Sequence, residues 1–214
     1  VKFKMNTEVG KDITIDKLRK QGYKGFYVAI GAQKSSKLNV PGEDLQGVFG
    51  GVDFLREVNL GKKPALGKKC AVIGGGNVAM DVCRTAVRLG AETYVVYRRS
   101  EAEMPARAEE VHHAKEEGIH FHMLTAPTSI EGNEDGFVKS IRCIEMKLGE
   151  PDERGRRRPV PIEGSEYELQ METVIVAIGN SPNPLIKKTT PDLPTEKWGG
   201  IQADESGRTG KKNV

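Results

Sequence analysis

Residues 69–100, KCAVIGGGNVAMDVCRTAVRLGAETYVVYRRS, decide the fold of this chain. The apolar run 70–73 has the length and composition of a buried parallel strand, and the glycine turn 74–79 follows it directly. After the turn, apolar residues recur at four-residue spacing, which predicts a helix that Gly90 ends. A second strand is predicted over 93–97. This order of strand, turn, helix and strand predicts the first βαβ unit of a dinucleotide-binding sheet.

The turn has the pattern G-x-G-x-x-A, in which small residues have distinct tasks. Gly74 allows the tight turn, and Gly76 lets backbone N–H groups approach a pyrophosphate without a Cβ between them. Ala79 lies where the helix and the strand pack closest. The alternative is a glycine-rich turn in some other α/β domain, but the strand before it and the helix after it favour the dinucleotide site.

The end of the second strand predicts which dinucleotide binds. An NAD-binding protein would carry Asp or Glu there for the ribose 2′-hydroxyl, whereas this sequence has Arg98 and Arg99. Two guanidinium groups suit the additional phosphate of NADP(H), which a carboxylate would repel. In the alternative, NAD would bind through Glu101 or Glu103, which lie past the strand end and more readily face solvent.

Composition excludes several classes of protein. The chain has 214 residues, enough for one large or two small domains, and a formal net charge of +3. We interpret Arg154, Arg156, Arg157 and Arg158 as a solvated hairpin tip rather than as part of a nucleic-acid surface. No apolar run approaches the about 20 residues of a membrane span. We therefore expect a soluble, cytoplasmic protein with neither nucleic acid nor membrane as a partner.

Cysteines and histidines offer no convincing metal or redox site. Cys70, Cys83 and Cys143 form no C-x-x-C pair, so we expect three small buried residues. The four histidines, at 112, 113, 120 and 122, lie within eleven residues, which raises the alternative of a metal site. The first two are adjacent on a predicted helix and point in different directions, and the other two begin a strand. We expect solvated or hydrogen-bonded histidines and no metal.

Two further stretches complete the predicted fold. An apolar strand is expected over 25–32, ending in Ala29-Ile30-Gly31. Beyond residue 137 the period changes to alternation, at 144–148 and 167–171, before an apolar run over 172–179 ends in a second Ala-Ile-Gly. The fold class is therefore α/β, of the FAD/NAD(P)-binding domain type. It has a Rossmann-like parallel sheet flanked by helices, with an antiparallel β-meander on one face.

Several short motifs occur together along nearly the whole chain. They are V-P-G-E-D at 40–44, D-F-L at 53–55, the glycine turn within 72–81, Y-R-R-S at 97–100 with M-P-A at 104–106, E-E-G at 116–118, G-E-P-D at 149–152, G-R-R at 155–157 and V-I-V-A-I-G at 174–179. With them the sequence resembles the NADPH-oxidising flavoprotein that forms the small (beta) subunit of bacterial glutamate synthase. Its relatives occur in dihydropyrimidine dehydrogenase and ferredoxin:NADP oxidoreductases.

The resemblance implies an organisation and a reaction. Residues 49–186 would form an NADP(H)-binding domain, 1–48 a partial FAD-domain remnant and linker, and 187–214 a truncated return segment toward the FAD domain. Hydride would pass from NADPH to FAD, and electrons would leave through iron–sulfur centres for glutamate synthesis from glutamine and 2-oxoglutarate. The partner would be the large glutamate synthase subunit or another iron–sulfur or ferredoxin-type acceptor. Because the flavin carries the chemistry, no catalytic side chain is expected in this chain.

The resemblance also implies the site residues. Gly74, Gly75, Gly76, Asn77 and Val78 would hold the pyrophosphate. Arg98, Arg99 and Arg107 would hold the 2′-phosphate, and Ala177, Ile178 and Gly179 would pass near the nicotinamide. The family's FAD-binding G-x-G-x-x-G, its cysteine-rich segment and its carboxyl-terminal Gly-Asp turn are missing, so we expect NADP(H) binding without retention of FAD. Two alternatives remain: a ferredoxin:NADP oxidoreductase subunit of similar build, and a non-catalytic NADP(H)-binding module.

Overall fold

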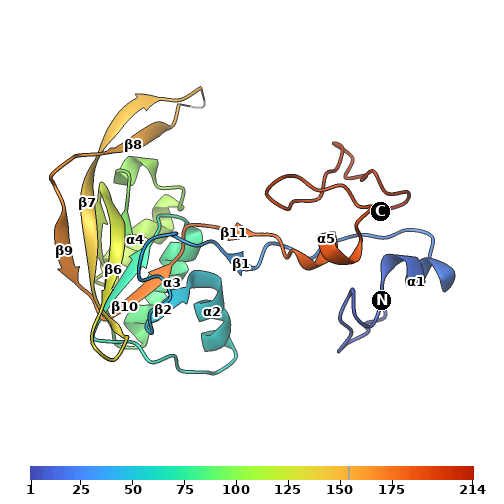
Figure 1. The fold of residues 1–214 in the computed structure, drawn as a ribbon, viewed down its shortest axis with the longest axis horizontal. Coiled ribbons are helices and arrows are strands. Elements are labelled where there is room, and N and C mark those ends of the chain that lie inside the picture. The colour runs from blue at the N-terminus through green and yellow to red at the C-terminus, as the bar shows by residue number, and fades with distance from the viewer. Residues whose placement is uncertain (154) are drawn as a thin grey trace. The chain divides into compact units, whose positions relative to one another are not determined.

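The computed structural model describes residues 1–153 and 155–214, so that Arg154 of the expected hairpin tip lies outside the described residues. Its contacts divide the chain into two compact units. One unit is Ser35–Gly179, and the other combines Val1–Lys34 with Asn180–Val214. The short strands β1 (Lys34–Ser35) and β11 (Asn180–Ser181), where the chain passes between the units, pair with each other (Figure 1).

A five-stranded parallel sheet forms the centre of the larger unit. Its order is β2-β10-β3-β4-β5. The strands are β2 (Val48–Gly50), β10 (Thr173–Val176), β3 (Lys69–Ile73), β4 (Glu92–Tyr97) and β5 (His120–Met123). The strands expected near residues 70, 93 and 121 are confirmed. The chain forms β3, β4 and β5 in sequence toward one edge, and β10 then returns on the other side of β3.

Helices cover one face of this sheet. They are α2 (Gly51–Asn59), α3 (Asn77–Arg88) and α4 (Ala108–Glu116), with the short 3-10 helix η1 (Glu101–Glu103) before α4. Alternate strand residues point to this face, so that Cys70 and Val72 of β3 share a core with Met80 and Val82 of α3. The helix predicted directly after the glycine turn is thus confirmed as α3, and the predicted helix that carries His112 and His113 is confirmed as α4.

An antiparallel sheet covers the opposite face (Figure 1). It contains β6 (Thr125–Gly132), β7 (Val138–Pro151), β8 (Arg157–Pro161) and β9 (Tyr167–Gln170), with β7 paired to the other three. Ala71 and Ile73, the β3 residues that alternate with the helix-facing ones, join Ile141 and Cys143 of β7 in a second core. The predicted fold class, a helix-flanked parallel sheet with an antiparallel meander on one face, is therefore confirmed.

The smaller unit contains two short helices, α1 (Ile15–Lys20) and α5 (Leu185–Thr189). The strand expected over 25–32 is wrong, because this stretch forms no ladder with a neighbouring strand. Its backbone instead donates a hydrogen bond from Phe26 N–H to the Asn213 carbonyl, 2.9 Å away. Phe26 and Val28 pack on the small core, whereas the intervening Tyr27 is 94% exposed. The residues have an apolar face but no partner strand.

The larger unit begins earlier than the residue-49 boundary expected for the NADP(H) domain. Leu38, Val40 and Leu45 pack against the core between the two sheets, which explains why the unit begins at Ser35. The assignment of 1–48, 49–186 and 187–214 to parts of two domains stays a prediction. Within the described ranges, no helix has the length and apolar character to cross a membrane.

Candidate functional site

A cavity of about 620 Å³ opens at the carboxyl ends of the parallel strands, and all its lining residues belong to the larger unit. It lies at the point where the strand order reverses, since β4 and β10 flank β3 on opposite sides. In open α/β sheets this crevice is the usual ligand site. The cavity is lined by Leu38, Val40, Ile73, Gly74, Gly75, Gly76, Asn77, Val78, Val96, Tyr97, Arg98, Arg99, Pro105, Thr125, Ala126, Pro127, Arg156, Ala177, Ile178 and Gly179.

The first two glycines of the turn are required by close packing of the protein itself. Gly74 has φ +145°, and a Cβ there would lie 2.2 Å from the carbonyl oxygen of Ala177. A Cβ at Gly75 would lie 2.8 Å from the ring of Tyr97. The Tyr97 hydroxyl in turn donates to the carbonyl oxygen of Glu103 at 2.9 Å. The turn is therefore held between the ends of β10 and β4.

Gly76 differs, because a Cβ there would meet no protein atom closer than Pro105 Cγ at 3.9 Å. Its φ of −94° is open to any residue, so the reason for glycine lies in the space above it. Gly76 caps α3 without a side-chain hydrogen bond, and the first turn of α3 carries no acidic residue. The free N–H groups of the helix N-terminus thus face a cavity that could accept an anion.

Two arginines line the cavity where β4 ends. Arg98 is exposed, whereas Arg99 is 9% exposed. The Nε–H group of Arg99 donates to the carbonyl oxygen of Arg157, 2.9 Å away. Among the described residues, the arginine ion pairs involve Arg84 and Arg88, on the helical face, and neither cavity arginine has a carboxylate partner. This end of the cavity therefore carries positive charge that no described carboxylate neutralises.

The other side of the cavity follows β10. Ala177 is buried and donates its N–H to the carbonyl of Ile73 at 2.8 Å, while Ile178 is 46% exposed. The loop through Leu38 lies at the same cavity, and the Glu43 carboxylate accepts the N–H group of Leu38 at 2.6 Å. This side is apolar, so the cavity has a basic end over β4 and an apolar end over β10.

Three sequence-predicted or alternative residues lie outside the cavity lining. Arg107 is exposed as the N-cap of α4, and its backbone N–H donates to Asn77 Oδ1 at 3.0 Å. Its location next to the glycine turn is thus explained by its main chain, and we leave its side chain out of the site. Glu101 pairs with Lys115 at 2.6 Å, and Glu103 accepts hydrogen bonds from Ser100. Both carboxylates thus have partners within the chain, and neither residue lines the cavity.

Arg156 is exposed between β7 and β8, as expected for a solvated hairpin tip. The structure also puts this residue in the cavity lining, which sequence reasoning did not predict, together with Thr125, Ala126 and Pro127 at the start of β6. The alternation along β7 and β9 predicted an antiparallel meander. It did not predict that the hairpin of this meander lies at the carboxyl ends of the parallel strands. The sequence did contain a signal for this placement: the hairpin and the end of β4 are both rich in arginine, as two parts of one anion site would be.

The histidines and cysteines form no reactive centre in the described part of the chain. No cluster of His, Cys, Asp and Glu there could hold a metal ion. His120 stacks on Tyr94, with ring centroids 4.9 Å apart. The three cysteines are buried free thiols, as expected, and burial raises the pKa of each to about 12. They are small core residues rather than a redox pair.

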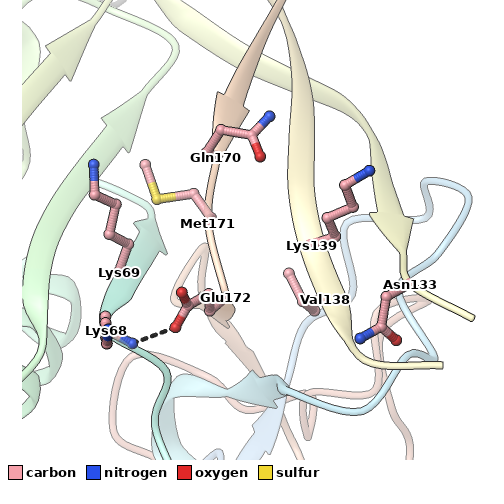
Figure 2. A pocket seen from close by; sticks show the side chains of 8 residues that line it. All are labelled: Lys68, Lys69, Asn133, Val138, Lys139, Gln170, Met171 and Glu172. Atoms are coloured by element: carbon pink, nitrogen blue, oxygen red, sulfur yellow. Dashed lines mark hydrogen bonds between the residues drawn. The ribbon is translucent and has the colours of Figure 1, made fainter. Parts of the chain in front are cut away.

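A second hollow, of about 520 Å³, lies at the amino ends of β3 and β10, the opposite edge of the sheet. Figure 2 shows Lys68, Lys69 and Lys139 around it, with Glu172 accepting a hydrogen bond from the backbone N–H of Lys68. Its lysines are exposed or half-buried, and it has neither a glycine turn nor a helix N-terminus. Its lysines are basic residues away from the carboxyl-end cavity, and they therefore serve as control positions for the cavity arginines.

The fold and the cavity together define a class, the dinucleotide-binding α/β domains of oxidoreductases. The chain belongs to the pyridine nucleotide-disulphide oxidoreductase family, whose sequence profile matches residues 2–214. It is 49% identical over 185 residues to the NADP(+)-dependent formate dehydrogenase subunit beta of Moorella thermoacetica, which covers 85% of this chain and 26% of that protein. The NADPH-Fe(3+) oxidoreductase subunit beta of Geobacter sulfurreducens is 42% identical, over 92% of this chain and 30% of that protein.

More distant similarities agree with this family. The glutamate synthase [NADPH] small chain of Escherichia coli is 36% identical, over 86% of this chain and 41% of that protein. The structure of Mycobacterium tuberculosis FprA in complex with NADPH has a TM-score of 0.78 at 22% identity, covering 96% of this chain and 59% of that one, which shows the shared fold. The chain thus spans about a quarter to a third of the length of the first two relatives.

Proposed function

We propose that this chain is the NADP(H)-binding part of a larger flavoprotein oxidoreductase that passes electrons from NADPH to FAD. The observation that carries the proposal is the pairing of a cation-rich end of the cavity with the N-terminus of α3. Arg98 and Arg99 lack carboxylate partners among the described residues, and Gly76 leaves open space above the helix. A pyrophosphate would accept hydrogen bonds from the helix N-terminus, and a separate phosphate monoester would neutralise the two arginines.

Strand order supports an orientation for the nucleotide. Residues 74–78 follow the central strand β3 and would receive the pyrophosphate through backbone N–H groups. Arg98 and Arg99 follow β4 on one side and would bind the ribose 2′-phosphate. Residues 177–179 follow β10 on the other side, where the half-exposed Ile178 offers an apolar surface to the nicotinamide.

FAD, when bound in the whole protein, would accept hydride from the nicotinamide, and this chain would supply alignment and exclusion of water rather than an acid or base. The residues fit an NADP(H)-binding role because Gly76 leaves space for the phosphates and because Arg98 and Arg99 have no carboxylate partner among the described residues. The sequence contains one G-x-G-x-x-A turn, at 74–79, and that turn lines the cavity at the carboxyl ends of the parallel strands, which we assign to NADP(H). We therefore propose that the chain by itself binds NADP(H) without retaining FAD.

The electron acceptor is proposed from the named relatives. Two relatives named as beta subunits of NADP-linked oxidoreductases share 49% and 42% of residues with this chain, and the glutamate synthase small chain shares 36%. We favour a partner subunit that carries iron–sulfur centres, which would pass the electrons on to the final acceptor. Glutamate synthesis is the second candidate, supported by the 36% identity over 86% of the chain.

A purified preparation of the chain is expected to bind NADPH and to lack flavin absorption. NADPH fluorescence should rise to a plateau on titration with protein, because the cavity removes the nicotinamide from water. The visible spectrum after incubation with FAD and gel filtration should show no flavin bands. A flavin spectrum that survives filtration would contradict the FAD statement, and fluorescence without saturation would contradict the NADPH statement.

A further inference from the structure

The hairpin between β7 and β8 brings a third arginine to the basic end of the cavity. Arg156 directly precedes β8 and lines the cavity together with Arg98 and Arg99. The three side chains come from different layers, because Arg98 and Arg99 follow β4 of the parallel sheet and Arg156 belongs to the antiparallel hairpin (Figure 1). The two layers meet at this end of the cavity.

The main chain of the hairpin holds Arg99 in place. Arg99 is nine-tenths buried, and its Nε–H group donates to the carbonyl oxygen of Arg157 at 2.9 Å. This is the only hydrogen bond of the guanidinium group among the described residues, which offer its Nη groups no acceptor. Arg99 is thereby oriented by one nitrogen and left able to bind a ligand through the others.

The turn that carries Arg156 is itself closed by hydrogen bonds. The N–H group of Arg156 donates to Asp152 Oδ1, and the N–H group of Asp152 donates to the carbonyl of Arg156, each at 2.9 Å. These two bonds fix the backbone of Arg156 where the residue lines the cavity. A pre-formed position reduces the entropy that would be lost when the side chain binds an anion.

The charges at this end call for a polyanionic ligand. Arg98, Arg99 and Arg156 form no ion pair with a described carboxylate, and the buried Arg99 would be costly to leave without a counter-charge. A phosphate monoester can accept several charge-assisted hydrogen bonds from arginines at once. A ribose hydroxyl, by contrast, gives three cations no charge to neutralise.

We propose that Arg156 contacts the 2′-phosphate of bound NADP(H), which makes the β7–β8 hairpin an element of nucleotide specificity. The inference rests on the proposed function, because the ligand is the same dinucleotide in the same cavity. It extends the phosphate site from the strand end, where Arg98 and Arg99 lie, to the covering antiparallel sheet. The hairpin then has two functions: its Arg157 carbonyl positions Arg99, and its Arg156 side chain binds the 2′-phosphate.

The test is calorimetric binding of NADP⁺ and NAD⁺ to the chain and to two variants. Arg156→Ala should raise the Kd for NADP⁺ about tenfold, the size expected for one charge-assisted hydrogen bond at an exposed position, and should leave the Kd for NAD⁺ unchanged. Arg158→Ala is the matched control, because Arg158 is exposed on the same hairpin but does not line the cavity. It should bind both nucleotides as the unaltered chain does.

An unchanged Kd for NADP⁺ in Arg156→Ala would overturn the inference, and so would an equal weakening for both nucleotides. A loss of the same size in Arg158→Ala would also overturn it, since the effect would then follow net charge rather than contact. If the unaltered chain itself binds NADP⁺ no better than NAD⁺, the proposed function fails together with the inference. A preference that is intact in the unaltered chain and in Arg156→Ala removes the inference alone.

Discussion

Replacing both Arg98 and Arg99 with alanine is expected to remove most of the preference of this chain for NADP⁺ over NAD⁺, leaving the part that Arg156 contributes. Each guanidinium group lines the basic end of the cavity and lacks a carboxylate partner among the described residues. The loss in NADP⁺ binding should be about 2–3 kcal/mol, or roughly 30- to 150-fold in Kd. Isothermal titration with each nucleotide measures it, and the Kd for NAD⁺ should change little.

The double variant Lys68→Ala with Lys139→Ala provides the charge-matched control. Both lysines are exposed at the second hollow, beside the amino ends of β3 and β10, so their loss removes two positive charges away from the cavity (Figure 2). This control should bind NADP⁺ like the unaltered chain. Because Arg99 also bonds the Arg157 carbonyl, circular dichroism should accompany the titration. A folded arginine double variant that keeps its preference would refute the assignment of the two arginines.

Gly74→Ala is expected to destabilise the fold, whereas Gly76→Ala should impair nucleotide binding alone. At Gly74, the new Cβ would lie 2.2 Å from the Ala177 carbonyl oxygen on a backbone with φ +145°. Strain and the clash together should lower the free energy of unfolding by about 3 kcal/mol. At Gly76, the nearest protein atom is 3.9 Å away, so the fold can accept the methyl group. That methyl group would stand where the phosphates approach α3.

Urea unfolding and calorimetry separate the two glycine effects. Gly76→Ala should unfold within about 0.5 kcal/mol of the unaltered chain, as surface substitutions usually do, and yet bind NADP⁺ about tenfold or more weakly. Each variant is the other's control, since both add the same methyl group to the same turn. A stable Gly74→Ala variant would contradict the packing account. Undiminished NADP⁺ binding by Gly76→Ala would contradict the assignment of the pyrophosphate position.

The parts of the fold that could be predicted from sequence are those with strong local patterns. The run 70–73, the glycine turn and the apolar rows of α3 specify a strand, turn and helix within a single stretch of chain. The change to alternation beyond residue 137 predicted the antiparallel layer, because one face of each of its strands is buried. The pyrophosphate candidates came from the same local turn, and the structure places all five in the cavity lining.

The features that sequence reasoning missed depend on contacts between distant residues. Arg156 lies 57 positions beyond Arg99, and no local pattern indicates that the hairpin returns to the end of β4. The stretch 25–32 has an apolar face and small residues at its end, but pairing in a sheet requires a neighbouring strand, which sequence periodicity does not reveal. The assignment of Arg107 to the 2′-phosphate stays a prediction: its backbone N–H donates to Asn77 Oδ1, and the residue is not part of the cavity lining.

The most direct test of the account is the ratio of the dissociation constants of NAD⁺ and NADP⁺ for the unaltered chain, measured by calorimetry in one buffer. The cation-rich end of the cavity predicts that NADP⁺ binds more tightly than NAD⁺ by about 2–3 kcal/mol. The reason is that the 2′-phosphate pairs with arginines that have no carboxylate partner among the described residues. Equal dissociation constants, or tighter binding of NAD⁺, would contradict the central claim that this cavity is an NADP(H) site.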